Sequence, residues 1–408
     1  MNKKKIINDP VYGFITIPFD IVHDIIEHPW FQRLTRIRQL GLTYLVYPGA
    51  IHTRFHHAIG AMHLMVNAIE TLRSKGHSIS GDEAEAAGIA ILMHDIGHGP
   101  FSHALEKLLV KNVSHEYISG LVMDRLNATF NGRLEEAIAI FNNTHEKKFL
   151  HQLVSSQLDV DRLDYLSRDS FFTGVSEGVI SSDRIIKMMD ISGGNLAVEE
   201  KGIYSVEKFI TARRLMYWQV YLHKTVIAAE HMLIHIILRA KELAANGVEL
   251  FGTPGLLEFL KNNHSENAFR DDKTLLEKFN ELDDFDVFTA VKVWCSHPDK
   301  VLALLCRGLV NRKLFKIEIS RTSFDPQVIA ERQEHISKHL GITFNEARYF
   351  VFAHTVENNA YDSDDDKINI LFKSGEIMDI ADASDNFNIS ALTRTVTKHF
   401  FCSYRIPG

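Results

Sequence analysis

The sequence predicts a mainly α-helical protein with short strands near its N-terminus and a small α+β region at its C-terminus. Apolar residues recur at helical spacing through most of residues 20–345, whereas residues 6–17 hold short β-like runs. Beyond about residue 351 the pattern changes, and residues 368–380 are typical of a β-hairpin over a Ser-Gly turn. We therefore expect a helical domain over 1–345 and a small α+β region over 346–408.

Composition narrows the class of protein. The chain has 408 residues, of which 45% are hydrophobic and 24% charged, as in ordinary globular proteins. Its net charge of -7 argues against a general attraction for nucleic acid. No signal peptide or membrane-spanning apolar run is visible, so we expect a cytoplasmic protein without a membrane partner. Cys295, Cys306 and Cys402 form no metal-binding pair and are expected to be reduced.

Helical periodicity divides the chain into helices and loops. The expected helical segments are 20–40 with a break at His28-Pro29, then 52–72, 81–93, 104–110, 115–126, 134–141, 157–169, 205–245, 256–260, 274–280, 284–295, 298–309 and 326–340. Loops are expected over 41–50 and 170–204, and the acidic run at 362–366 is typical of a solvated loop. No internal repeat is visible.

The most informative stretch is residues 91–103, where an apolar run carries a His-Asp pair into a Gly-Pro break and further histidines follow. His94 and His98 are four residues apart and share a face if the helix continues through them. The adjacent imidazole and carboxylate of His94 and Asp95 are good ligands for a divalent cation. With His103, three imidazoles fall within ten positions, more than a core needs, so the stretch predicts a metal-dependent site.

Upstream, the helix that begins near residue 52 carries two candidate histidines. Either His56 or His57 can point into the core, and spacing alone does not choose between them. Arg54 lies three residues before His57 and therefore on the same side of the helix. A guanidinium beside a metal ligand indicates recognition of phosphate or carboxylate.

Downstream, residues 157–169 place four carboxylates among apolar residues at helical spacing. A helix that buries its apolar face half-buries Asp161, and a buried carboxylate needs a partner or a metal. Asp161 therefore either belongs to a salt-bridged helix with Arg162 and Arg168 or completes the ligand set. Further on, Arg213, Tyr217 and Tyr221 share one side of a helix, which fits either a base-and-phosphate surface or a core helix with a basic rim.

The ordered set His57, His94-Asp95 and Asp161 resembles the HD-domain metal phosphohydrolases. Longer motifs resemble the deoxynucleoside triphosphate triphosphohydrolase branch of that family over roughly residues 6–320. These motifs are Asn8-Asp9-Pro10-Val11-Tyr12-Gly13, Phe31-Gln32-Arg33-Leu34, Arg38-Gln39-Leu40-Gly41, Arg54-Phe55-His56-His57, residues 94–103, Ser114-His115-Glu116 and Asp159-Val160-Asp161-Arg162-Leu163-Asp164-Tyr165.

The resemblance implies a role for each matching residue. The ligands of a divalent metal, which could be Mn, Mg, Fe, Ni or Zn, would be His57, His94, Asp95 and Asp161. The histidines near the scissile phosphate would be His98, His103 and His115, with the acids Glu106 and Glu116 close to them. The substrate-binding residues would be Gln39, Leu40, Arg54, Arg162, Tyr165, Asp169, Arg213 and Tyr221.

The chain departs from the family pattern at a few positions. Its metal-adjacent motif reads Arg-Phe-His-His instead of Arg-Phe-Glu-His, and Arg162 stands where the family has Lys. Regulated members bind a guanine nucleotide between subunits. Glu27 and Thr35 differ from the Asp and Arg of that site, whereas Arg312 and Lys316 match its basic pair. A nucleotide activator and a homo-oligomer, dimer or tetramer, follow from the resemblance only.

The expected activity is metal-dependent hydrolysis of deoxynucleoside triphosphates to deoxynucleoside and inorganic triphosphate. One alternative is a nucleotide phosphomonoesterase or phosphodiesterase that uses the same metal site. Another is a nucleotide-sensing protein without catalysis, against which the complete ligand set and the additional histidines argue. The sequence leaves the preferred deoxynucleotide open.

Overall fold

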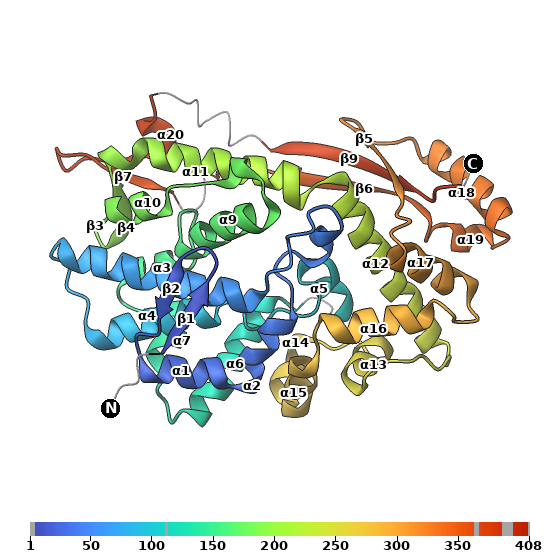
Figure 1. The fold of residues 1–408 in the computed structure, drawn as a ribbon, viewed down its shortest axis with the longest axis horizontal. Helices are drawn as coiled ribbons and strands as arrows, with labels where there is room; N and C mark the ends of the chain where they lie inside the picture. The colour runs from blue at the N-terminus through green and yellow to red at the C-terminus, as the bar shows by residue number, and fades with distance from the viewer. Residues whose placement is uncertain (1–4, 111–112, 363–366, 386–394, 407–408) are drawn as a thin grey trace.

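The computed structural model of the chain, drawn in Figure 1, describes residues 5–110, 113–362, 367–385 and 395–406. The mainly α class predicted from the sequence is confirmed, with a few small sheets at the periphery. No helix among the described residues has the length and apolar character needed to cross a membrane. Most of the acidic run at 362–366 lies outside the described residues, as does the side chain of His103.

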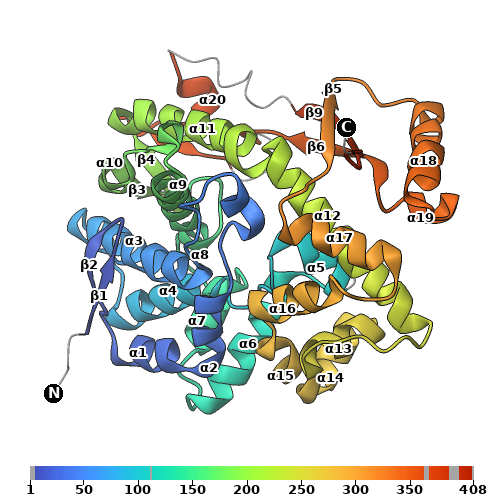
Figure 2. The ribbon, with the colours of Figure 1, turned by 45° about the vertical axis from the view of Figure 1, so that its right-hand side comes forward.

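A pair of long buried helices forms the core of the first half of the chain. Helix α3 (Arg54–Ser74) packs against α4 (Gly81–Met93) on one side and α9 (Val160–Thr173) on another. Both α3 and α4 are buried around much of their circumference, as expected for helices inside a large core. Figures 1 and 2 show this group in the left half of the molecule.

The N-terminal segment begins with the predicted strands and then departs from the prediction. β1 (Ile6–Asp9) and β2 (Gly13–Thr16) form an antiparallel hairpin. The helical segment breaks at His28-Pro29 as expected, between α1 (Asp20–Glu27) and α2 (Pro29–Gln32), but no α-helix continues to residue 40. Instead, two 3₁₀ turns, η1 (Arg33–Arg36) and η2 (Gly41–Leu45), follow. The reason is tertiary, because Arg33 is buried and donates to the carbonyl oxygens of Ile96, His98 and Leu282.

The middle of the chain is more ordered than predicted. Its helices are α5 (His103–Leu109), α6 (His115–Thr129), α7 (Glu135–Phe141), α8 (Lys148–Val154) and α10 (Ser182–Met188), with a 3₁₀ turn, η3 (Ser176–Gly178). The loop expected over 170–204 is wrong in part, since it holds η3, α10 and a hairpin of β3 (Met189–Ser192) and β4 (Asn195–Glu199). Gly193 and Gly194 have positive φ and form the hairpin turn, so two glycines that indicated a loop connect two strands.

The single helical region predicted for 205–245 is interrupted. After the short turn η4 (Glu200–Gly202), α11 (Ile203–Met216) runs into a π-helical segment, η5 (Tyr217–Tyr221), and α12 (Lys224–Ala245) starts anew. His223 has extended backbone angles and its side chain accepts from the N–H of Thr225, so it caps α12. The break changes the direction of the chain beside the site described below.

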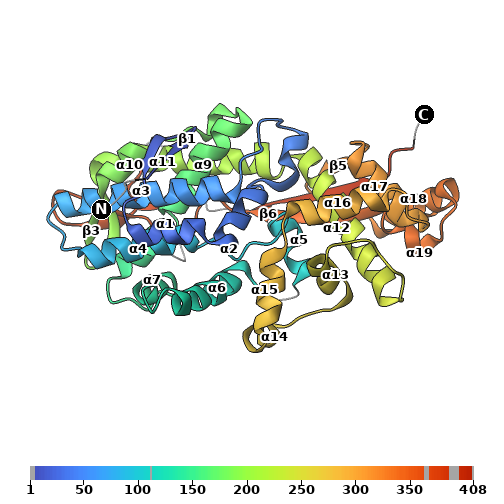
Figure 3. The ribbon, with the colours of Figure 1, turned by 60° about the horizontal axis from the view of Figure 1, so that its bottom comes forward.

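The C-terminal part contains helices followed by strands. These elements are α13 (Pro254–Lys261), α14 (Glu266–Asp271), α15 (Lys273–Glu281), α16 (Asp284–Trp294), α17 (Lys300–Val310), β5 (Lys316–Ser320), α18 (Pro326–Leu340), α19 (Phe344–Ala347), β6 (Val351–Asn358), β7 (Asn369–Leu371), β8 (Ile377–Asp379), α20 (Ile380–Ala383) and β9 (Val396–Ser403). Figure 3 shows α18 and α19 toward the end of the molecule opposite β3.

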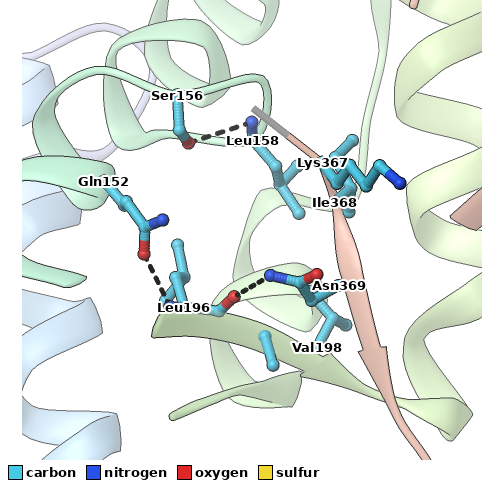
Figure 4. Close-up of a pocket in the computed structure, with 9 residues that line it drawn as sticks. Gln152, Ser156, Leu158, Leu196, Val198, Lys367, Ile368 and Asn369 are labelled. Carbon is cyan, nitrogen blue, oxygen red and sulfur yellow. Dashed lines mark hydrogen bonds between the residues drawn. The ribbon is translucent and has the colours of Figure 1, made fainter. Parts of the chain in front are cut away.

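Two sheets join the C-terminal strands to the earlier chain. The predicted hairpin of β7 and β8 is confirmed, and β7 also pairs in parallel with β4. Strand β9 pairs with both β5 and β6. Figure 4 shows the β4–β7 junction, where Gln152 and Asn369 both bond the backbone of Leu196 beside a cavity of about 20 Å³, room for about one water molecule. The proposed domain boundary at residue 345 stays a prediction.

Candidate metal centre and adjoining cavity

Four side chains from three helices converge at one point in the core. His57 comes from α3, His94 and Asp95 follow the end of α4, and Asp161 lies in the first turn of α9. The Nε2 atom of His57 lies 3.0 Å from Oδ1 of Asp161 and 3.7 Å from Oδ2 of Asp95. The Nε2 atom of His94 lies 3.3 Å from Oδ1 of Asp95 and 3.5 Å from Oδ1 of Asp161. The four predicted ligands are therefore brought together.

The turn after α4 gives His94 and Asp95 their positions. The helix ends at Met93, as expected, so the condition under which His94 and His98 would share a helix face is not met. Gly97 is required there, because an added Cβ would lie 2.2 Å from the backbone of α6. Ser119 on α6 accepts from the N–H of Gly97 and donates to the carbonyl of His94. This contact turns the chain and brings Nε2 of His98 to 3.4 Å from Asp95.

Hydrogen bonds fix the orientation of both imidazoles. Nδ1 of His57 donates to Asp164 at 2.8 Å, and Nδ1 of His94 donates to the carbonyl of Ile91 at 2.6 Å. Asp164 is fully buried and is held in turn by Arg168. Such bonds leave Nε2 of each ring pointing toward the centre, which is the arrangement that metal-binding histidines use. His56, the alternative to His57, instead accepts from the N–H of residue 53 at the start of α3.

The donor set fits a divalent cation. Nε2 of His57 and Nε2 of His94 are buried and make no hydrogen bond to any residue that the structure describes. Burial lowers the pKa of His57, but Asp161 and Asp164 together raise it to about 10. A cation bound between the imidazoles and carboxylates would replace this proton and satisfy both nitrogens. Two imidazoles with two carboxylates suit several first-row transition metals as well as harder cations.

Arg54 connects the centre to its surroundings. It is buried, forms an ion pair with Asp95 and donates to Oγ of Ser102 at 2.8 Å. Burial opposes the charge on Asp95, yet His94 and Arg54 hold the pKa of that carboxyl well below its usual range. Phe101 and Ser102 both have positive φ, a strained backbone that persists where the surroundings enforce it. The predicted guanidinium beside the metal ligands is therefore in place.

The predicted acid–base group lies next to the centre. The rings of His98 and His115 stack at 3.8 Å, and Nδ1 of His115 lies 2.9 Å from Glu106. Nε2 of His115 lies 3.2 Å from the exposed Glu116. Burial and Arg54 lower the pKa of His98 well below its ordinary value, so His98 is neutral at physiological pH.

A cavity of about 460 Å³ adjoins the centre, within the usual size range of ligand sites. All eight predicted substrate residues line it, namely Gln39, Leu40, Arg54, Arg162, Tyr165, Asp169, Arg213 and Tyr221. Asp95, His98, His115 and Asp161 form part of the same wall. The cavity therefore joins the candidate metal centre, the acid–base group and the predicted substrate residues in one space.

Several lining residues were not identified from the sequence. Thr43, Ser102, Leu222 and Glu230 contribute to the cavity. Burial raises the pKa of Glu230, on α12, to about 7. Glu230 sits in an ordinary amphipathic pattern, so its position in the sequence carried no signal. Ser102 lay within the recognised motif, but only the contact with Arg54 gives it a role.

Comparison with known proteins agrees with this geometry. The family described as HD domain matches residues 54–169, and the family described as HD associated region matches residues 180–268. A crystal structure of a phosphohydrolase from Bacteroides thetaiotaomicron is 56% identical, covers 98% of this chain and 100% of its own, and superposes with a TM-score of 0.95. The chain belongs to the HD-domain phosphohydrolases.

Two curated proteins are also similar to this HD-domain phosphohydrolase. The protein YwfO of Bacillus subtilis is 33% identical over 78% of this chain and 72% of its own length. The deoxynucleoside triphosphate triphosphohydrolase SAMHD1 of Danio rerio is 28% identical over 78% of this chain and 56% of its own length. The expectation of a phosphohydrolase enzyme is confirmed at the level of the family.

Proposed function

We propose that this HD-domain phosphohydrolase hydrolyses deoxynucleoside triphosphates to deoxynucleosides and inorganic triphosphate. The observation that carries the proposal is the cavity, which begins at the candidate metal centre and is lined by three arginines and three tyrosines. A guanidinium group can bind two phosphate oxygens at once through two parallel hydrogen bonds, and tyrosine rings pack against sugars and bases. The name of the Danio rerio relative supports the same class of substrate.

His57, His94, Asp95 and Asp161 would hold a divalent cation, which when bound activates water and polarises the phosphoryl group. The protein's own arginine side chains would neutralise the negative charge of the triphosphate. Arg54 lies beside Asp95, and Arg162 and Arg213 line the wall further along. We infer that these guanidinium groups bind the triphosphate and stabilise the charge that develops during transfer.

His115 is the proposed general acid. Water attacks the α-phosphorus, the bond to the 5′-oxygen breaks, and that oxygen needs a proton. Glu106 contacts both the backbone N–H and Nδ1 of His115, which fixes the ring so that its other nitrogen can donate. His98 stacks on this ring and stays neutral, so it serves as a hydrogen-bonding group for phosphate. His103 remains the alternative acid.

Product analysis tests the proposal. The purified protein is incubated with each deoxynucleoside triphosphate and Mn²⁺ or Mg²⁺, with and without GTP, and parallel reactions contain nucleoside monophosphates and cyclic nucleotides. Inorganic triphosphate together with deoxynucleoside supports the proposal. Orthophosphate or a ring-opened nucleotide as the main product would favour a phosphomonoesterase or phosphodiesterase. Bound nucleotide without turnover in any metal would favour a sensing protein.

The activator and the homo-oligomer remain proposals that the same preparations can test. Arg312 and Lys316 are exposed, and Nε of Arg312 donates to the carbonyl of Leu45, at the end of η2. Light scattering with and without GTP measures the mass of the particle. A shift from a smaller to a larger oligomer on addition of GTP would support an activator site between subunits, and an unchanged mass would contradict it.

A further inference from the structure

His52 lies in the loop before α3 and outside the proposed ligand set. Its side chain is fully buried, and its Nε2 atom lies 2.7 Å from Oδ1 of Asp169. The hydroxyl of Tyr221 donates to the other oxygen of that carboxylate at 2.7 Å. Asp169 and Tyr221 line the cavity, whereas His52 lies behind them. Both oxygens of Asp169 are therefore held by donors, one from each side.

The ring of His52 is fixed by helix α9 as well. It stacks on Phe172 with ring centres 4.5 Å apart and an angle of 18° between the planes. Phe172 lies three residues after Asp169, so one helix supplies both contacts. Nδ1 of His52 is buried and has no hydrogen-bond partner among the described residues. An unpaired buried nitrogen is costly, so packing alone does not account for histidine here, whereas the bond to Asp169 does.

The backbone of His52 holds a second part of the wall. Its carbonyl accepts from the N–H of Gln39 at 3.0 Å, and the neighbouring residues Arg38 and Thr53 form a β-bridge with each other. Gln39 lines the cavity next to Leu40. One residue thus joins the segment that carries Gln39 to the helix that carries Asp169.

We propose that His52 is a positioning residue that aims Asp169 at the 3′-hydroxyl of the deoxynucleotide, an inference that rests on the proposed function. Each carboxylate oxygen can accept more than one hydrogen bond, so an oxygen that is already held can still accept from a hydroxyl. With its orientation fixed by His52 and Tyr221, the carboxylate loses little freedom when substrate binds. His52 itself does not touch the nucleotide.

Two substitutions separate the hydrogen bond from the packing. His52→Phe keeps a ring to stack on Phe172 but has no donor for Asp169. His52→Gln places an amide N–H close to the position of Nε2, so it restores the donor. His52→Asn places its amide close to Nδ1, too short to reach Asp169, and serves as a second donor-less variant if His52→Phe does not fold. His77→Phe is the matched control, since it removes another imidazole–carboxylate contact, with Asp190, that is remote from the cavity.

The measured quantity is the ratio of kcat/KM for a deoxynucleoside triphosphate to kcat/KM for its 2′,3′-dideoxy analogue. Both reactions are monitored by the release of inorganic triphosphate. We expect the ratio to fall about tenfold in His52→Phe and His52→Asn, to return toward the wild-type value in His52→Gln, and to be unchanged in His77→Phe. An unchanged ratio in the donor-less variants, or an equal loss for both nucleotides, would overturn the inference.

A second readout keeps this test separate from the proposed activity. If no nucleotide yields triphosphate, the proposed function fails by itself. In that case, titration calorimetry with Mg²⁺ measures the ratio of the affinity for dGTP to the affinity for 2′,3′-dideoxy GTP. A lower ratio in His52→Phe than in the wild type supports the positioning role, and equal ratios, or no binding of either nucleotide to the wild type, contradict it.

Discussion

The two ring nitrogens of His57 have different partners, and this difference defines the site. Nδ1 donates to Asp164, which Arg168 holds by two contacts, while Nε2 faces Asp95 and Asp161. The buried acid thus fixes the tautomer and the direction of the ring before any cation binds. Because Asp164 and Arg168 are fully buried, this orientation does not depend on solvent.

Removing one ligand tests the centre at the scale of single residues. Asp95→Ala deletes a carboxylate and leaves Arg54 without its ion-pair partner. We expect metal content and turnover to fall by more than about 100-fold. Residues that only hydrogen-bond to metal ligands cost up to about 100-fold when they are removed, and losing a ligand should cost more. Metal analysis and kinetic assays measure both losses, and circular dichroism verifies the fold. Asp82→Ala, which removes an exposed carboxylate at the start of α4, is the control. Normal turnover in metal-analysed Asp95→Ala would end the proposed mechanism.

At the scale of elements, the site depends on how closely α3 and α9 approach. Gly60 on α3 faces Asp164 and Arg168, and an added Cβ would lie 2.1 Å from atoms of both. A methyl group there cannot be accommodated unless the buried pair moves. The same glycine thus permits both the helix packing and the hydrogen bond to His57.

Gly60→Ala is therefore expected to destabilise the protein by about 1–3 kcal/mol and to weaken metal binding, because it displaces Asp164. Gly88→Ala is the matched control on α4. Its Cβ would meet only a ring carbon of Phe19 at 3.8 Å, so alanine should stabilise the helix by about 0.5–1 kcal/mol. Thermal unfolding and metal affinity measure both variants. Equal melting temperatures for Gly60→Ala and the wild type would show that α9 can move without cost.

Helices α12 and α17 are joined by a charged group whose contribution depends on pH. Arg239 on α12 contacts Asp299, which also caps α17 through the N–H of Leu302. Burial opposes the charge on Asp299, but Arg239 lowers the pKa of this carboxyl. A folded-state pKa below the unfolded value means that the stabilisation is present above the unfolded pKa and is lost as pH falls through the folded pKa.

Asp299→Asn removes the charge and keeps a good capping side chain. We expect it to lower stability by about 1 kcal/mol near pH 7, with the difference disappearing as the pH falls below the ordinary aspartate pKa of about 3.9 and through the lowered pKa of the folded state. Thermal melting of the wild type and the variant across this range measures the effect. A difference that stays constant between pH 7 and pH 3 would assign the loss to capping or packing instead of charge.

Some parts of the site and of the fold could be predicted from the sequence, and others could not. His57, His94, Asp95 and Asp161 were identifiable because their residue types and motifs carry the chemistry. The pair of His52 and Asp169, which are 117 positions apart, could not be identified, since only the fold brings them together. The loop assigned to 170–204 failed because Gly193-Gly194 fits a hairpin turn as well as a loop. The break after α11 had one local sign, the capping side chain of His223.

For the whole molecule, the pairing of β4 with β7 and of β5 with β9 connects the chain on both sides of residue 345. Buried side chains of the C-terminal strands, including Ile370, Phe400 and Cys402, complete the core beneath these sheets. A chain that ends at residue 345 would expose β4 and β5 as unpaired edges, and such edges promote association.

We therefore expect the 1–345 fragment to aggregate or to melt well below the full chain, and the full chain to unfold in one calorimetric transition. A chain ending at residue 406 is the control, because it keeps β9. Size-exclusion chromatography and scanning calorimetry compare the three proteins. A monodisperse 1–345 fragment with the melting temperature of the full chain would make residues 346–408 a separate domain, and the metal centre would then need only the helical part.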